Sequence, residues 1–417
     1  MKRLITLSLL LLSAFNVKAD GSLSPYDLGR PIGWATVEGQ TTGSNDENAV
    51  VVSSLSELNA ALKTARDNIK KDAGYKMTIY VKGEIETSSV IYLQDSKNIT
   101  IYGLPGSALI NKNRDTKSST GIFVNKRCEN IIMRNMTFKS AGAYDIDGND
   151  NLTLQSSKHI WIDHCDFQDG VDGNFDCNSQ SNNICVSWCR FRYLISPKAG
   201  GSGGSNDHRF SNLWGGSDSA DDDGYLNTTF VCCWWDEGCR ERMPRIRFGR
   251  IHILNCLYSS SVTSYAVGIG YKARAYVENS VFDFTINSSH KVWKYASTSG
   301  QDDHSFIFKG CQGISDTKDQ KQEDYFIPSE TYAYEAFDAN LVKEAISNEE
   351  TGAGATLDIK EGEPFTTGIA NSDDKLITRK TVYHNVSGKQ VSPLTKGVII
   401  RTDIMSDGTR RVRKIIR

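Results

Sequence analysis

A nine-residue pattern recurs six times between residues 130 and 282 and restricts the folds open to this chain. Each copy is rich in β-branched and aromatic residues, as strands are, and ends in a large aromatic side chain. Because one such unit cannot bury its apolar side alone, the copies must stack. The copies are 130–138 (NIIMRNMTF), 159–167 (HIWIDHCDF), 183–191 (NICVSWCRF), 227–235 (NTTFVCCWW), 250–258 (RIHILNCLY) and 274–282 (RAYVENSVF).

The spacing of the copies indicates which stacked fold they form. Their starts are 29, 24, 44, 23 and 24 residues apart. A strand-rich, helix-poor period of about two dozen residues is typical of a parallel β-helix. We therefore expect an all-β chain folded as a single-stranded parallel β-helix. The long gap of 44 residues holds a glycine-rich run and Asp221 to Asp223, so it predicts a loop insertion on one face of the coil.

Two segments outside the repeats predict helices. Ser54 and Glu57 form a capping-box pattern, and apolar residues follow with helical spacing over residues 55–65. Placed before the first coils, this short N-terminal helix would cap the open end of the stack. A second helix is expected at about residues 332–347.

The two ends of the chain differ from the repeats. Lys2 and Arg3 precede an apolar run that is too short to span a membrane, and small residues follow it, so residues 1–19 predict a secretory signal peptide. The β-helix domain should occupy residues 20–357. A polar linker at 358–380 and a small β tail at 381–417, ending in basic residues, should complete the chain.

Composition narrows the function by exclusion. The 417 residues include 48 Lys and Arg against 50 Asp and Glu, so nothing global favours nucleic acid, and any binding of a polyanion must be local. The ten cysteines lack the paired CxxC spacing of zinc sites. Most of them lie in strand-like apolar runs, where they are expected to act as small core residues.

Two local clusters suggest a site that binds a metal and a polyanion together. The segment 242–247 (RMPRIR) contains three permanently cationic arginines. Asp150 and the segment 172–176 (DGNFD) supply carboxylates elsewhere in the same repetitive scaffold. Oxygen ligands of this kind favour Ca²⁺ over transition metals.

Four motifs occur in one order: WIDHCDF at 161–167, DG-x-x-D at 172–176, RMPRIRFG at 242–249 and VGIGYKARAYVENSVF at 267–282. With them the chain resembles polysaccharide lyase family 1, the pectate lyases, over about residues 33–354. The resemblance implies a right-handed parallel β-helix and a secreted enzyme, which we expect to be monomeric. Such an enzyme cleaves de-esterified polygalacturonate by calcium-assisted β-elimination and leaves 4,5-unsaturated oligogalacturonides.

The same resemblance assigns roles to single residues. Asp150, Asp172 and Asp176 match calcium-binding positions of the family. Arg242 matches the first arginine of the family pattern R-x-P-x-x-R and is the candidate base, whereas Arg247 matches the second and should bind a substrate carboxylate in bidentate fashion. Because a guanidinium is not normally deprotonated in proteins, a base of this kind implies an alkaline optimum.

The chain departs from the family at two positions. Gly148 stands where many members have a further calcium-binding carboxylate, so the metal site should be poorer in protein ligands. Phe210 stands where members usually have a lysine. His208 or Arg209 is expected to bind substrate in place of that lysine, with Lys198 as a third choice.

Two other acidic segments have simpler interpretations. Asp163 and His164 lie in the best-matching motif but are expected to support the coil rather than catalyse. Asp221 to Asp223 could bind a further cation, although a solvated acidic loop is the simpler interpretation.

A short stretch of the tail carries a second resemblance. From about residue 385 onward, SGKQV and KGVIIR resemble the C-terminal sorting domains of Bacteroidetes type IX secretion. This resemblance implies export, with the protein either released or attached to the cell surface.

Three other functions stay open from the sequence. A pectin lyase would act on methyl-esterified polymer without calcium, and the three aspartates oppose it. A hydrolase on the same fold would use paired acids and give saturated products. A β-helical adhesin or polysaccharide-binding protein would show no turnover, and the R-x-P-x-x-R segment argues against it.

Overall fold

The computed structural model describes residues 29–314, 321, 324–362, 378–385, 389, 391, 398–405 and 410–416. The chain divides into two compact units, Met1–Phe365 and Thr366–Arg417, and each is described by itself. The predicted signal peptide at residues 1–19 lies outside the described residues.

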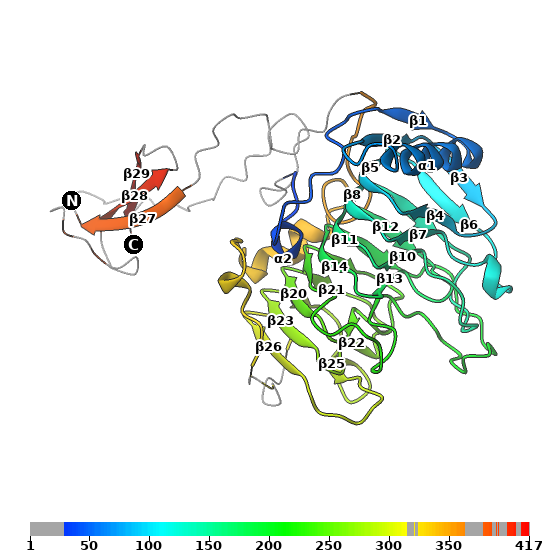
Figure 1. The fold of residues 1–417 in the computed structure, drawn as a ribbon. Helices are drawn as coiled ribbons and strands as arrows, with labels where there is room; N and C mark the ends of the chain where they lie inside the picture. Colours follow the sequence, from blue (N-terminus) through cyan, green and yellow to red (C-terminus); the bar gives the residue numbers. More distant parts are fainter. Residues whose placement is uncertain are drawn as a thin grey trace, which may run out of the picture. The chain divides into compact units, whose positions relative to one another are not determined.

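Three parallel sheets wind around one core in the first unit, as Figure 1 shows, and this confirms the predicted parallel β-helix. Sheet A contains, in spatial order, β1 (Val50–Val52), β2 (Met77–Val81), β5 (Lys97–Gly103), β8 (Glu129–Arg134), β11 (Lys158–Asp163), β14 (Asn182–Ser187), β17 (Thr228–Val231), β20 (Arg250–Leu254), β23 (Arg274–Glu278) and β26 (Ser305–Lys309).

The other two sheets each contain eight strands. Sheet B contains β3 (Glu84–Thr87), β6 (Ala108–Asn111), β9 (Thr137–Lys139), β12 (Asp166–Gln168), β15 (Arg190–Arg192), β18 (Trp234–Trp235), β21 (Leu257–Tyr258) and β24 (Val281–Phe282). Sheet C contains β4 (Ile91–Gln94), β7 (Phe123–Lys126), β10 (Leu152–Gln155), β13 (Phe175–Asn178), β16 (Leu213–Trp214), β19 (Arg245–Ile246), β22 (Tyr265–Ile269) and β25 (Lys291–Tyr295).

The sequence repeat explains how the coils align. Each copy begins at a strand of sheet A and ends in a strand of sheet B, so equivalent residues lie one above another. Ile160 pairs with Ile131 on one side and Ile184 on the other, and all three are fully buried. Repeating the same aliphatic side chain at one position therefore builds a continuous core.

The aromatic residue that ends each copy forms a second ladder inside the coil. Along sheet B, neighbouring ring centroids lie 4.5–5.5 Å apart in stacked orientation. Offset-stacked pairs of this kind add about 0.5–1.5 kcal/mol each beyond the burial of their area. The ladder consists of Phe138, Phe167, Phe191, Trp235, Tyr258 and Phe282.

The predicted N-terminal helix is α1 (Leu55–Ile69), and it packs on the first strands of the coil. The Ser54 side chain accepts a hydrogen bond from the Glu57 backbone N–H at 3.3 Å, as expected of an N-cap. Glu57 reaches back to the backbone N–H of Ser53 at 2.7 Å, one residue earlier than in a standard capping box.

The second predicted helix, at 332–347, starts too early. α2 spans only Ala339–Ile346, with Asp338 as its N-cap. Tyr332 and Phe337 lie outside the helix and pack against sheet A instead. The Tyr332 hydroxyl lies 3.0 Å from the Thr229 hydroxyl, so the apolar spacing reflects docking on the coil rather than a helical face.

The segment after α2 runs back along the coil. The backbone of Leu357 exchanges two hydrogen bonds with the Asn135 side chain, at 2.8 and 2.9 Å. Leu357 and Ile359 are buried with Tyr80 and Tyr102 of the first coils. These residues therefore pack with the β-helix. The described residues of this unit also form three short 3₁₀ helices: η1 (Gly33–Thr36), η2 (Lys117–Ser119) and η3 (Pro328–Glu330).

The second unit contains one antiparallel sheet. Its strands are β27 (Thr378–Asn385), β28 (Val398–Met405) and β29 (Arg410–Ile416), paired in that order. Much of the stretch that resembles a sorting domain, including residues 386–388 and 392–397, lies outside the described residues.

The cysteines behave as expected of core residues. None of the ten forms a disulfide, and nine are buried. In the described part of the chain, no helix has the length and apolar character needed to cross a membrane.

Candidate active site

Sheet C brings the predicted acidic residues together. Asp150 lies two residues before β10, Asp172 lies three residues before β13, and Asp176 lies within β13. β10 and β13 are parallel neighbours, with Thr153 opposite Asp176. Parallel pairing therefore places all three carboxylates at the start of adjacent strands, although 26 residues of sequence separate the first from the last.

Gly173 leaves the space in which two of these carboxylates meet. A Cβ atom placed on Gly173 would lie 2.8 Å from Asp150 Oδ1 and 3.3 Å from Asp176 Oδ1. Asp150 Oδ2 accepts a hydrogen bond from the Thr153 hydroxyl at 2.9 Å, whereas the buried Oδ1 atom has no partner. An unpartnered buried carboxylate oxygen beside a space that a second carboxylate also borders fits the ligand set of a hard cation such as Ca²⁺.

The electrostatics of the pair agree with this fit. Burial raises the pKa of Asp150 well above its usual value, and the negative charges of Asp176 and Asp172 add to the effect. Burial also raises the pKa of Asp176, to about 7, although the positive charge of Arg242 opposes the shift. Packing carboxylates this closely is costly without a cation.

Arg242 lies beside this acidic group. It is three residues before β19, which is two strands from β13 in sheet C. Its φ of 58° is in the left-handed region, which is uncommon for a residue with a side chain and is found at functional sites. Its Cζ atom lies 4.7 Å from the centre of the Phe210 ring. Among the described residues, the Arg242 guanidinium makes no ion pair or hydrogen bond.

Arg247 is held more tightly than the sequence suggests. Its Nε donates to Asp218 Oδ1 and its Nη1 to the backbone carbonyl of Gly215, both at 2.6 Å. Asp218 also accepts hydrogen bonds from Ser297 and from two backbone N–H groups of the 298–299 turn. The Nη2 group and the second N–H of Nη1 remain for a ligand, and the bidentate contact expected of Arg247 stays a prediction.

The pKa values around Arg247 follow from these contacts. Burial alone would raise the pKa of Asp218, but the hydrogen bonds from Arg247, Ser297 and the turn outweigh burial and lower it. Burial, followed by the positive charge of Arg247, lowers the pKa of Arg245 to about 10. The Arg245 Nη2 atom donates to the backbone carbonyl of Ala296 at 2.7 Å.

The three candidates for the missing lysine have different surroundings. Arg209 forms a two-pronged ion pair with Asp207, at 2.6 and 2.7 Å. Lys198 lies 2.5 Å from Asp115. His208 is buried between Asp172 and Asp145, with its ring stacked obliquely near Phe210. The two cations are thus already paired, and substrate binding by any of the three stays a prediction.

Sequence reasoning did not single out Asp145. Three possible metal ligands lie within 4.8 Å of one another: a carboxylate oxygen of Asp145, one of Asp172 and a ring nitrogen of His208. This arrangement could hold a metal ion. Asp145 comes in an unremarkable turn sequence, AYDIDG, and nothing in its spacing marks it.

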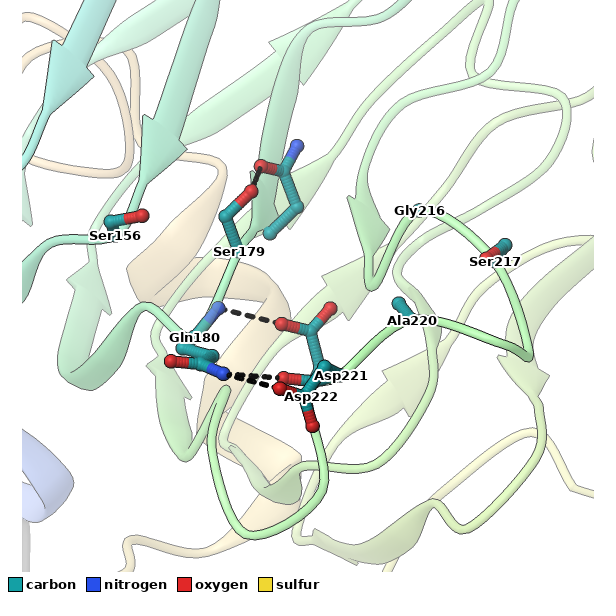
Figure 2. Close-up of a pocket in the computed structure, with 9 residues that line it drawn as sticks. Ser156, Ser179, Gln180, Gly216, Ser217, Ala220, Asp221 and Asp222 are labelled. Carbon is teal, nitrogen blue, oxygen red and sulfur yellow. Dashed lines mark hydrogen bonds between the residues drawn. The ribbon is translucent and has the colours of Figure 1, made fainter.

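The acidic loop at 221–223 lies where strands of sheet C end, whereas the predicted calcium ligands lie near the starts of these strands. Asp221 and Asp222 line a hollow of about 550 Å³ together with Ser156, Ser179 and residues that follow β10, β13 and β16. Figure 2 shows Gln180 donating hydrogen bonds to both aspartates. The predicted metal ligands and Arg242 lie near the starts of strands of sheet C, whereas Arg247 follows β19 and contacts Gly215, next to this hollow.

Asp163 and His164 form part of a buried structural network. Asp163 accepts hydrogen bonds from Arg134 at 2.7 Å and from Ser187, and it lies 2.8 Å from the His164 ring. Both side chains are at most 1% exposed, so they cannot reach a polymer. The structure agrees with the supporting role expected for them.

Comparison with known proteins gives the family. A sequence model described as pectate lyase matches residues 23–356, which is most of the chain. The chain belongs to the pectate lyase family. It is therefore a polysaccharide lyase by family, and the observed β-helix is the fold that this family uses.

Individual relatives are distant but consistent. A probable pectate lyase B of Aspergillus terreus is 30% identical over 261 residues, which is 60% of this chain and 68% of the relative. A pectate trisaccharide-lyase of Thermotoga maritima is 30% identical over 278 residues, covering 63% of this chain and 66% of the relative.

Solved structures show the same fold. A pectate lyase bound to a hexasaccharide superposes with a TM-score of 0.61 at 22% identity, covering 79% of this chain and 98% of that chain. A thermostable pectate lyase superposes with a TM-score of 0.60 at 20% identity, covering 80% of this chain and 99% of that chain.

Proposed function

We propose that this pectate lyase cleaves de-esterified polygalacturonate by calcium-assisted β-elimination and releases 4,5-unsaturated oligogalacturonides. The observation that carries the proposal is that Asp150 and Asp176 border one space beside the Arg242 guanidinium, which has no ion pair among the described residues. A site that combines clustered carboxylates with a free cation suits a substrate that is itself an anion and that binds together with a metal.

The chemistry demands such a combination. In galacturonate the C5 hydrogen lies next to the C6 carboxylate, and O4 is the leaving atom on C4. Loss of the C5 proton and departure of O4 form a C4=C5 double bond without water. The difficulty is that a carbanion beside an ionised carboxylate is very unstable, so positive charge must be placed at that carboxylate.

Asp150, Asp172 and Asp176 are the residues that would hold calcium. Bound there, calcium would neutralise the sugar carboxylate and make the C5 hydrogen more acidic. The orphaned Asp150 Oδ1 atom and the open space at Gly173 support this ligand set. Gly148 adds no carboxylate, so substrate and water would have to complete the coordination.

Arg242 would take the C5 proton, for which it must first be neutral. Within the described parts of the chain its side chain makes no ion pair, and it rests against the Phe210 ring, which restricts where the guanidinium can go. Arg247 would contact a substrate carboxylate through its remaining N–H groups, and its pair with Asp218 would hold it in place. Arg209 could bind substrate only by sharing its charge with Asp207.

One assay tests this function. Purified protein is given polygalacturonate at alkaline pH with added calcium, and the ultraviolet absorbance of unsaturated uronide is followed with and without a chelator. Absorbance that rises and is abolished by the chelator is expected. A chelator-resistant rise on methyl-esterified polymer would indicate a pectin lyase, saturated products a hydrolase, and binding without products a non-catalytic protein.

The export of the protein and the roles of its ends are part of the same proposal. The charged and apolar pattern of residues 1–19 supports a signal peptide. The β-helix domain would occupy 20–357, and the linker predicted at 358–380 would run from Ile359, which packs on the coil, to β27. The resemblance within 381–417 supports type IX export to the medium or the cell surface. We expect the exported protein to be a monomer. Deleting 381–417 should spare catalysis but disturb export, and loss of folding would contradict this division.

A further inference from the structure

His208 occupies an unusual position beside the proposed calcium site. The residue is 5% exposed, so a polymer in solution cannot reach its ring easily. Its Nε2 atom lies 3.4 Å from Asp172 Oδ1, and its Nδ1 atom lies 3.3 Å from Asp145 Oδ1. Each ring nitrogen therefore lies within ion-pair distance of a different carboxylate, without the geometry of a hydrogen bond, and the imidazole spans the gap between them.

Asp145 forms the fixed end of this arrangement. Its Oδ2 atom accepts a hydrogen bond from the Ser205 backbone N–H at 2.7 Å, and its backbone carbonyl accepts one from Gly203 at 2.8 Å. A Cβ atom on Gly203 or Gly201 would come within about 2 Å of Asp145, so the loop can follow this path only with glycine. The 201–205 segment thus clamps Asp145 from two sides.

Asp172 forms the less restrained end. Its side chain is 24% exposed, and in the described part of the chain His208 is the only side chain within ion-pair distance of it. By contrast, Asp150 is held by Thr153 and Asp176 by the Leu213 backbone N–H. A carboxylate without a partner would sample several rotamers and lose entropy on binding a metal.

We propose that His208 is a positioning residue that ties Asp172 to Asp145 and thereby sets Asp172 in place to bind calcium, instead of contacting the sugar. The inference rests on the proposed function, because it takes Asp172 as a calcium ligand. Partners that orient metal ligands typically change metal affinity by about 10–100-fold when they are removed.

Two substitutions separate the two ends of the imidazole. Gln at position 208 can place an amide nitrogen near the Nε2 position and keep the contact with Asp172. Asn is shorter, so it can reach Asp145 but not Asp172. Calcium affinity of the substrate-free protein, measured by isothermal titration calorimetry, should fall about 10–100-fold in His208→Asn and clearly less in His208→Gln.

The controls distinguish positioning from other roles. His159→Asn changes a histidine at the start of β11 in sheet A and should leave calcium affinity unchanged. At saturating calcium, the KM of His208→Asn for polygalacturonate should stay near that of the natural protein. If His208→Asn does not fold, Asp145→Asn tests the same link and should also weaken calcium binding.

Three results would overturn the proposal. Unchanged calcium affinity in a folded His208→Asn protein would show that Asp172 needs no such link. An equal loss in the Gln and Asn variants, with equally lowered melting temperatures, would show a structural role only. A raised KM with an unaltered calcium titration would make His208 a substrate-binding residue. If the natural protein itself binds no calcium, the proposed metal site is also wrong. The three results above, by contrast, would overturn only the role of His208.

Discussion

Substituting Gly173 by alanine tests whether two carboxylates share one metal ion. The added Cβ atom would lie 2.8 Å from Asp150 Oδ1, whereas ordinary van der Waals contact begins at 3.4 Å. The Asp150 oxygen would therefore have to retreat by about 0.6 Å, well beyond the tolerance of about 0.2 Å for ligand positions in a metal site. The Asp176 oxygen, at 3.3 Å, would be crowded less.

The same substitution should harm the fold little. Gly173 does not have a positive φ, so alanine can adopt its backbone conformation. Replacing glycine at such a position restricts the unfolded chain and stabilises a protein by about 0.4–1 kcal/mol, which offsets part of the crowding. Gly173→Ala should therefore melt within a few degrees of the natural protein while binding calcium roughly tenfold or more weakly, that is, by about 1.4 kcal/mol or more.

Calorimetric titration with calcium and the calcium dependence of turnover measure this effect. Gly216→Ala is the matched control, because a Cβ atom there would meet nothing within 4 Å and its φ is not positive. An unchanged calcium titration in Gly173→Ala would refute the reasoning, since it would mean that Asp150 and Asp176 do not converge on a metal.

Three further predictions concern charge. Arg242→Lys should lower kcat by about 10²–10⁴-fold with little change in calcium affinity, and an unaltered rate would exclude Arg242 as the base. Asp218→Asn leaves the buried Arg247 charge uncompensated and should lower the free energy of unfolding in urea by about 3–5 kcal/mol. Because folding lowers the pKa of Asp218, the natural protein should lose this stabilisation as the pH falls below about 4. The variant should show no such loss. Folding raises the pKa of Asp150 and raises that of Asp176 to about 7, so the calcium-free protein should lose stability as the pH rises from about 4 through 7. A chelator should therefore lower the melting temperature more at pH 8 than at pH 5. An equal effect at both pH values would contradict the carboxylate cluster.

The fold was largely predictable because its signal is repeated. An isoleucine or an aromatic residue at one place in each copy has the same environment in every coil, so Ile160 or Phe191 can be placed from the sequence alone. The second helix was predicted too long because this logic does not apply after the last coil. There, Tyr332 and Phe337 obtain their burial from sheet A, and burial against a sheet can imitate a helical pattern.

The candidate site was predictable only in part. The motifs with Asp150, Asp172, Asp176 and Arg242 were visible because a family resemblance marks them. In the structure Asp150 and Asp176 border one space, and the charges of Asp172 and Arg242 act on both. The partners that hold them left no such mark. Asp145 is 63 residues from His208, and Asp218 is 29 residues from Arg247, so each pair exists only after the coils have stacked.

A crystal structure of Arg242→Lys with calcium and an oligogalacturonide tests the central claim most directly. The account predicts a calcium ion bound by Asp150, Asp172, Asp176 and a sugar carboxylate, with the side chain of residue 242 facing C5 of that sugar. An oligosaccharide bound on another sheet, or a sugar ring whose C5 faces away from residue 242, would contradict it.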